Sequence, residues 1–380
     1  MMTSRERVMG AVNRTGYDRI PVKHEGTPEI DRMLMDYFGL TNHEQLLRVL
    51  GSDFRYVEPV YTGPELRTFP DGSIEGYFGE RYRYAEFEGG KYLEASYLPY
   101  AGIETLAQLD RSHFPSADWF DYSAIRPQCE KLAEQGVAIC CGTAGDMDFI
   151  NSIARCRGTE QVLIDLIEDN EVYLAIMDAR FEFFYEQHRR MLEAAGGLID
   201  FAHVGDDLGS QTGPMISPDI FERHFAAKYK KYFDMVHSYG ARSKMHMCGC
   251  VHSFLPRLTE LGLDVYDVVQ PTTPEMDIAV LKKKYGNKLI FCGTVCVQST
   301  IAFGTPADVE REVKRRLELF KDGGLFIGPT HAIQVGSPPE NILTLYRTAG
   351  SLTEKEDIGA DILSIQGSGD EGKISRSKLF

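Results

Sequence analysis

Short apolar runs alternate with longer helical patterns through most of this chain. Most of the apolar runs are predicted strands, and most of those strands are followed by a predicted helix. Outside residues 66–98, the predicted strands begin near residues 19, 53, 137, 199, 243, 264, 288 and 325. Eight β/α units are typical of a (β/α)8 barrel of the TIM type. A doubly wound open sheet is the structural rival, but no Gly-x-Gly-x-x-Gly follows the first strand. We therefore expect one α/β barrel over residues 1–352.

Two stretches depart from this alternation. Residues 66–98 are rich in Tyr, Phe and Gly, with turn signals at Pro70-Asp71-Gly72 and Glu88-Gly89-Gly90. They predict a small insertion of two or three antiparallel strands. Residues 353–380 are polar and predict a mobile C-terminal tail.

Composition and charge limit the kinds of partner that the chain could bind and indicate its cellular compartment. The 380 residues carry a net charge of −15 with no Lys/Arg-rich run, which argues against a nucleic-acid partner. No apolar run approaches the ~20 residues of a membrane span, and the N-terminus lacks the apolar core of a signal peptide. We expect a cytoplasmic protein whose eight cysteines are thiols or metal ligands rather than disulfides. A homodimer is compatible with the sequence.

The C-terminal ends of the predicted strands carry most of the metal-competent and acid–base residues. Barrel enzymes place their active sites at these ends. The residues found there are His24, Glu25, Glu58, Cys140, Cys141, Asp206, Asp207, His246, Cys248, Gln270, Cys292 and His331.

The stretch Ser243–Cys250 gives the sharpest metal hypothesis. In an extended segment, residues two apart point the same way, so His246 and Cys248 could share one Zn²⁺. His331 leaves a later strand end, and three protein ligands with one open position form the catalytic zinc arrangement. The alternatives are a buried strand with a hydrogen-bonded His, and an active-site His331 without metal. Cys250, Cys292 and Cys296 are alternative thiolates or buried apolar residues.

Asp206 and Asp207 lie in Gly-Asp-Asp-Leu-Gly after a predicted strand. Neighbouring carboxyl groups can divide their roles, one ionised and the other with a raised pKa for proton exchange. The alternative is a carboxylate that caps backbone N–H groups of the following turn. We expect one of each.

Several motifs together resemble the uroporphyrinogen decarboxylase superfamily. They are Arg5-Glu6-Arg7-Val8, Asp18-Arg19-Ile20-Pro21, Gly205–Gln211, His246-Met247-Cys248-Gly249, Gly304-Thr305-Pro306, Gly328-Pro329-Thr330-His331 and Pro339-Glu340-Asn341-Ile342. The resemblance implies a (β/α)8 barrel. It also implies one of two activities: cofactor-free decarboxylation of tetrapyrrole acetate side chains, or zinc-dependent methyl exchange with a corrinoid protein.

The decarboxylase branch carries an Arg-rich motif after its first strand to hold substrate carboxylates. Here that place reads Lys23-His24-Glu25-Gly26-Thr27-Pro28, without the bidentate arginine donors. The resemblance matches Asp53 to the essential Asp of that branch and His331 to its pocket His. Asp53 begins a strand, at the wrong end for a barrel site, so only the resemblance gives it a substrate-binding role.

The methyltransferase branch has His-x-Cys followed by a distant Cys. His246 and Cys248 match the first two positions, and His331 stands at the third. Gln270 stands where the family's fourth ligand may be a carboxylate, and a neutral Gln would hydrogen-bond substrate instead. We predict metal ligands His246, Cys248 and His331, catalytic roles for Asp206, Asp207 and His331, and substrate binding by His24, Glu25, Asp53 and Gln270.

The resemblance thus predicts a methyltransferase. It would move a methyl group between a small methoxylated or methylated substrate and a partner corrinoid protein, with Zn²⁺ at the site. The alternatives are a cofactor-free decarboxylase of a porphyrinogen or related carboxylic acid, and a non-catalytic barrel that binds a corrinoid or tetrapyrrole.

Overall fold

The computed structural model describes residues 2–367. This part of the chain divides into two compact units. The first unit contains residues 2–55, 132–138 and 264–367, and the second contains residues 56–131 and 139–263. Residues 368–380 of the predicted tail lie outside the described residues.

The main sheet is parallel and has seven strands in the order β1-β7-β8-β9-β10-β11-β12. Nearly all of its residues are buried, as expected for parallel strands covered by helices. The strands are β1 (Phe54–Val57), β7 (Ala138–Cys141), β8 (Phe201–Gly205), β9 (Arg242–His246), β10 (Val265–Val269), β11 (Ile290–Val295) and β12 (Leu325–Pro329). The parallel strands alternate with helices, and small antiparallel sheets accompany them, so the predicted α/β fold of the TIM type is confirmed.

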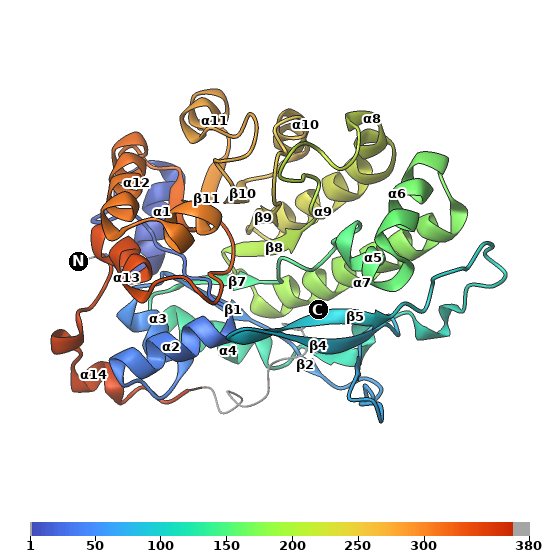
Figure 1. Ribbon diagram of the computed structural model, residues 1–380, viewed down its shortest axis with the longest axis horizontal. Helices are drawn as coiled ribbons and strands as arrows, with labels where there is room; N and C mark the ends of the chain where they lie inside the picture. Colours follow the sequence, from blue (N-terminus) through green and yellow to red (C-terminus); the bar gives the residue numbers. More distant parts are fainter. Residues whose placement is uncertain (1, 368–380) are drawn as a thin grey trace. The chain divides into compact units, whose positions relative to one another are not determined.

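Helices follow the strands along the chain, and local sequence sets many of their ends. Thr3 with Glu6, and Thr305 with Asp308, form capping boxes, and Asn170 caps the longest helix. Figure 1 shows α5, α6 and α7, in green, packed together. The helices are α1 (Ser4–Asn13), α2 (Pro28–Phe38), α3 (His43–Val49), α4 (Ile125–Glu134), α5 (Asn151–Arg157), α6 (Thr159–Glu168), α7 (Glu171–Ala195), α8 (Pro218–Ile220), α9 (Ala226–Ser238), α10 (Leu255–Leu261), α11 (Ile278–Tyr285), α12 (Pro306–Leu319), α13 (Pro339–Thr348) and α14 (Ala360–Leu363).

The prediction of a first strand over residues 19–25 is wrong. It forms no extended strand, only isolated parallel bridges of Val22 with Ile327 and of Gly26 with Ile333. The Val22 carbonyl also accepts the N–H of Asp53, which directly precedes β1. The segment therefore occupies the eighth position, between β12 and β1, without a continuous ladder. Pro21 contributes to this because it has no N–H to donate.

The predicted antiparallel insertion is confirmed within the second unit. It consists of β3 (Ile74–Glu75), β4 (Arg81–Phe87) and β5 (Gly90–Tyr97), in that order. The β4–β5 hairpin, teal in Figure 1, turns tightly where Phe87 pairs with Gly90. A smaller antiparallel pair joins β2 (Val60–Tyr61) to β6 (Phe120–Asp121).

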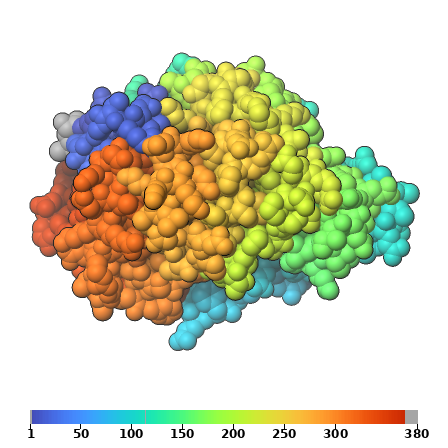
Figure 2. All heavy atoms as spheres, turned by 90° about the horizontal axis from the view of Figure 1, so that it is seen from above, coloured from blue at the N-terminus to red at the C-terminus, as the bar shows by residue number. Residues whose placement is uncertain are grey.

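The start of the predicted mobile tail is held against the first unit. Residues 355–357 and α14 form helical turns. Gln45 donates to the carbonyls of Leu363 and Ile365, and Asn42 also donates to Ile365. Figure 2 shows the N-terminal residues of the same unit, in blue, against its orange and red C-terminal segments, where the Gly324 N–H donates to the Ala11 carbonyl. Among the described helices, none combines the length and apolarity needed to cross a membrane.

Candidate metal and acid–base site

The site in the second unit is built on the end of β9. His246 is the last residue of this strand, and Cys248 follows in the loop. Gly249 adopts φ +75°, and a Cβ there would meet the backbone of Gly209 and Ser210. Glycine is therefore required for this close approach. The Cys250 N–H donates to the Ser210 carbonyl at 2.8 Å, which joins the loops after β8 and β9.

His246 and Cys248 come together as their spacing predicts. Cys248 Sγ lies 3.3 Å from His246 Nε2. The register of β8 and β9 places Gly205 beside His246, so no side chain crowds the imidazole from that strand. All eight cysteines lie in the described part of the chain, and Cys248 alone is not fully buried. Of the alternative thiolates, Cys250, Cys292 and Cys296 are each buried.

Asp206 is buried behind this pair. Its Oδ2 accepts the Tyr229 hydroxyl at 2.8 Å, and its Oδ1 accepts the Ile150 N–H at 3.2 Å. Burial first, and then the neighbouring Asp148 carboxyl, raise the pKa of Asp206 well above its usual value. The neutral, protonated carboxyl is therefore favoured at this position.

Asp207 faces the loop that carries Cys248. Its Oδ1 accepts the Cys248 N–H at 2.9 Å, and its Oδ2 accepts the Asn151 side-chain amide at 2.8 Å. The two neighbouring acids thus have different surroundings. Asp206 lies in a buried carboxyl pair, whereas half-buried Asp207 holds backbone and amide donors.

Sequence reasoning missed Asp148 and Asn151. Asp148 accepts the backbone N–H groups of Asn151 and Ser152 at 2.9 and 3.1 Å, so it caps the start of α5. Burial, followed by the charge of Asp207, raises the pKa of Asp148. The sequence signal was present, because an Asp preceding Asn-Ser after a predicted strand is typical of a helix N-terminus.

In the first unit, the side chains of His24 and Glu25 have different partners. His24 Nδ1 lies 2.5 Å from the Tyr346 hydroxyl on α13, and Nε2 lies 2.9 Å from Asp31 Oδ1 on α2. Its ring is therefore buried among helices, which favours a structural role over the predicted substrate contact. Glu25 Oε2 lies 2.7 Å from Lys23 Nζ, and its side chain stays partly exposed.

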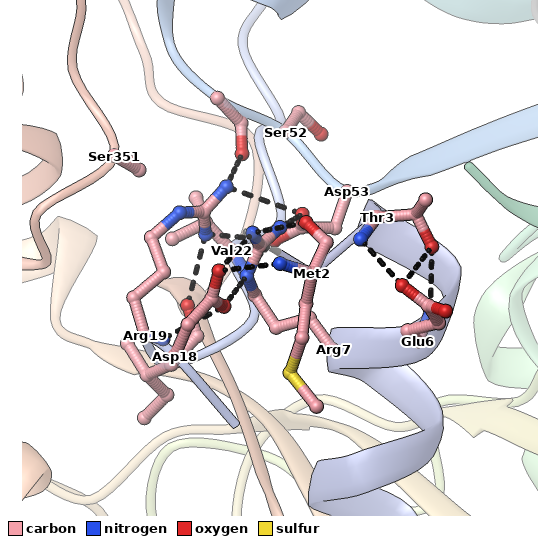
Figure 3. Close-up of polar contacts among 12 residues, drawn as sticks. Met2, Thr3, Glu6, Arg7, Asp18, Arg19, Val22, Ser52, Asp53 and Ser351 are labelled. Atoms are coloured by element: carbon pink, nitrogen blue, oxygen red, sulfur yellow. Dashed lines mark hydrogen bonds and ion pairs between the residues drawn. The ribbon is translucent and has the colours of Figure 1, made fainter. Parts of the chain in front are cut away.

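Asp53 is enclosed by two arginines (Figure 3). Its Oδ1 accepts Arg7 Nη1 at 2.7 Å, and its Oδ2 accepts Arg19 Nη1 at 2.9 Å and the Val22 N–H at 2.8 Å. The side chain has no exposed surface. This geometry favours a buried ion-pair role at the start of β1 over the predicted contact with substrate.

Gln270 and His331 lie where the sequence predicts, just beyond the C-terminal ends of β10 and β12. Gln270 is buried, and its carbonyl accepts the Thr273 hydroxyl at 2.9 Å. His331 is half-buried and follows Thr330, whose N–H donates to the Val295 carbonyl at the end of β11. The ligand role of His331 and the substrate contact of Gln270 stay predictions.

Comparison with known proteins shows to which family this chain is similar. The uroporphyrinogen decarboxylase (URO-D) family model matches residues 78–352. A solved methyltransferase from Methanosarcina mazei superposes with a TM-score of 0.63 at 17% sequence identity, covering 92% of this chain and 99% of that chain. This likeness shows the fold.

Other solved structures are more distant. Dispersin B gives a TM-score of 0.38 at 10% identity, covering 86% of this chain and 95% of its own. The 3-keto-D-glucoside 4-epimerase YcjR from E. coli gives 0.37 at 14% identity, covering 60% and 86%. Both TM-scores are too low to support a conclusion about this chain. No curated protein matches it. Because the family model spans most of its length, the chain belongs to the uroporphyrinogen decarboxylase (URO-D) family.

Proposed function

We propose that this chain is a methyltransferase that moves a methyl group between a small methoxylated or methylated substrate and a corrinoid protein. The observation that carries the proposal is the 3.3 Å separation of His246 Nε2 and Cys248 Sγ. Two such ligands of a tetrahedral zinc ion lie about 3.5 Å apart. The donor pair therefore fits zinc, with little movement required on binding.

His331 is our candidate for the third ligand. It follows β12, as His246 ends β9, and TIM-type enzymes build their sites from the C-terminal ends of several strands. Together, His246, Cys248 and His331 are the donor set that we propose for one metal ion. Two imidazoles and one thiolate leave a fourth position for substrate.

When bound, zinc would supply Lewis acidity to a substrate oxygen and so make it a better leaving group. The chain's own residues have separate tasks. Asp207 fixes the Cys248 backbone and so orients the thiol. Asp206 keeps a protonated carboxyl behind the strand end, where Tyr229 and the Ile150 N–H hold it in place.

The decarboxylase alternative has less support. Lys23 is the cation of the segment that would grip substrate carboxylates, and its Nζ lies 2.9 Å from Asp267 and 2.7 Å from Glu25. A lysine between two carboxylates is a poor anchor for several more.

The test is methyl transfer itself. The purified chain is incubated with a reduced corrinoid protein and a panel of methoxylated aromatics, and the visible spectrum reports methylation of the corrinoid. We expect methylation with the wild type and with Cys250→Ala, and loss with His246→Ala. Release of CO2 from a porphyrinogen without any methylation would overturn the proposal in favour of decarboxylation.

A further inference from the structure

Asn151 begins α5, in the segment of the second unit that follows β7. Its backbone N–H donates to Asp148 Oδ1 at 2.9 Å, and the N–H of the preceding Ile150 donates to Asp206 Oδ1 at 3.2 Å. These two bonds fix the backbone from which the Asn151 side chain extends. The segment leaves the C-terminal end of β7, and TIM-type enzymes build their sites at this end of the strands.

One end of the Asn151 side chain is also fixed. Its Nδ2 donates to Asp207 Oδ2 at 2.8 Å, while Asp207 Oδ1 accepts the Cys248 N–H at 2.9 Å. A carboxylate only accepts hydrogen bonds, so the NH2 end of the amide must face Asp207 and Oδ1 must face the other way. The partner of this amide therefore determines its orientation.

The oxygen of the Asn151 amide is available to a ligand. Within residues 2–367, no donor contacts Asn151 Oδ1. The side chain is half-buried, and Oδ1 is not one of the enclosed polar atoms, so it reaches open space. The hydrogen bond from Nδ2 to the Asp207 carboxylate polarises the amide and makes Oδ1 a stronger acceptor. A hydrogen-bond donor on a ligand fits this position, and a carboxylate does not.

We propose that Asn151 selects a methoxylated phenol as the substrate, because its Oδ1 accepts the phenolic hydrogen. The inference rests on the proposed function and names its substrate class. Asp207 holds Asn151 and Cys248 on its two oxygens, so both residues lie around one carboxylate. A methoxyl oxygen beside Cys248 and a hydroxyl beside Asn151 are then close together. Two such oxygens are closest on adjacent ring carbons, so the hydroxyl lies next to the methoxyl group.

The hydrogen bond to Asn151 would discriminate against substrates that lack the hydroxyl. A ligand of the same shape without this group would cover Oδ1 and leave it without a donor. Burying an unsatisfied acceptor costs free energy, so the site rejects such an analogue more strongly than an apolar pocket would. Asn151 thus sets specificity through direct contact with the substrate, whereas Asp207 is a positioning residue that acts through Cys248 and Asn151.

The test compares two ligands of the same shape by calorimetry, on the full chain as purified. We expect 2-methoxyphenol to bind about tenfold more tightly than 2-methylanisole, in which a methyl group replaces the hydroxyl. The 4-substituted pair should differ less, because its hydroxyl lies across the ring from the methoxyl group. Asn151→Leu should remove the preference and leave the affinity for 2-methylanisole nearly unchanged. The same substitution at exposed Asn287, which precedes β11, is the matched control and should change neither affinity.

Four results would overturn the inference. They are equal affinity for the two ligands, an equally large preference in the 4-substituted pair, a preference that persists in Asn151→Leu, and an equal loss of both ligands in that variant (which is expected if Asn151 only supports the loops). If Asn151→Leu does not fold, Asn151→Ala decides by the same criteria. Equally efficient methyl transfer from 2-methylanisole and 2-methoxyphenol would remove the inference and keep the proposed function. Selective binding of 2-methoxyphenol without any methyl transfer would do the reverse.

Discussion

The backbone N–H of Cys248 donates to Asp207 Oδ1 at 2.9 Å, and the other oxygen of that carboxylate accepts the Asn151 amide at 2.8 Å. One side chain thereby joins the loops after β8 and β9 to the first turn of α5. Since Cys248 Sγ lies 3.3 Å from His246 Nε2, the position of Asp207 constrains the geometry of the donor pair.

Asp207→Asn should weaken zinc binding and turnover about tenfold, while the thermal midpoint changes little. The neutral amide loses the charge-assisted character of the hydrogen bonds that the carboxylate accepts from Cys248 and Asn151, which is worth roughly 1 kcal/mol. Zinc titration and the methyl-transfer assay measure the effect. The swapped pair Asn151→Asp with Asp207→Asn restores a donor opposite an acceptor and should recover most of both. Exposed Asp219→Asn is the control, and an unchanged zinc affinity in Asp207→Asn would contradict the argument.

Asp31 gives a pH-dependent prediction in the first unit. Burial alone would raise the pKa of Asp31, but hydrogen bonds and charge from His24 and His43 outweigh it and lower the pKa to about 2. The folded-state pKa is thus below the unfolded value of about 3.9. Its stabilisation is therefore present above about pH 4 and is lost as the pH falls toward 2.

Asp31→Asn should accordingly reduce the free energy of unfolding by about 2 kcal/mol at pH 5. The difference from wild type should shrink between pH 4 and pH 2. Urea denaturation at several pH values measures it, with exposed Asp36→Asn on the same helix as control. A difference that grows on acidification would show that the sign is wrong.

The barrel was predictable because its signals are local. Apolar runs of five or six residues, such as β11 and β12, and capped helices such as α1 can be recognised within one window of sequence. The segment at Val22 could not be predicted in detail. Its bridges to Ile327 and Ile333 depend on residues about 300 positions away, and Pro21 removes one donor.

Contacts in the candidate site were likewise predictable only where the residues are close together in the sequence. His246 and Cys248 are two residues apart, so strand geometry alone brings them together. Asn151 and Asp207 are separated by 56 positions, and no sequence pattern indicates their contact. The ion pairs of Asp53 could not be predicted for the same reason, because its partners Arg7 and Arg19 precede it by 46 and 34 positions.

Replacing Asp53 tests whether this residue forms a buried ion pair or contacts the substrate. Asp53→Asn leaves Arg7 and Arg19 without their shared carboxylate, and breaking a buried pair in this way costs about 3–5 kcal/mol. Denaturant unfolding should show that loss, while zinc content per folded chain is unchanged. Asp18→Asn, which removes a partly exposed partner of Arg7, should cost much less. If Asp53→Asn keeps its stability and loses substrate affinity, the predicted substrate role is correct instead.

The last prediction concerns the metal ligands. Purified wild-type chain should carry about one zinc per chain by elemental analysis. Cys248→Ala and His246→Ala should each lower the occupancy strongly, because either change removes one of the two donors that are 3.3 Å apart. His331→Ala should lower it as well if it supplies the third ligand.

Substitution with Co²⁺ separates these ligands from residues that only support the fold. A tetrahedral cobalt site with one thiolate should show a sulfur-to-metal charge-transfer band that disappears in Cys248→Ala and persists in His331→Ala at reduced intensity. Cys250→Ala is the matched control, since Cys250 is two residues away and buried. Full zinc occupancy without Cys248 would refute the site at its centre. Full occupancy without His331 alone would leave a His246–Cys248 site that takes its third ligand elsewhere.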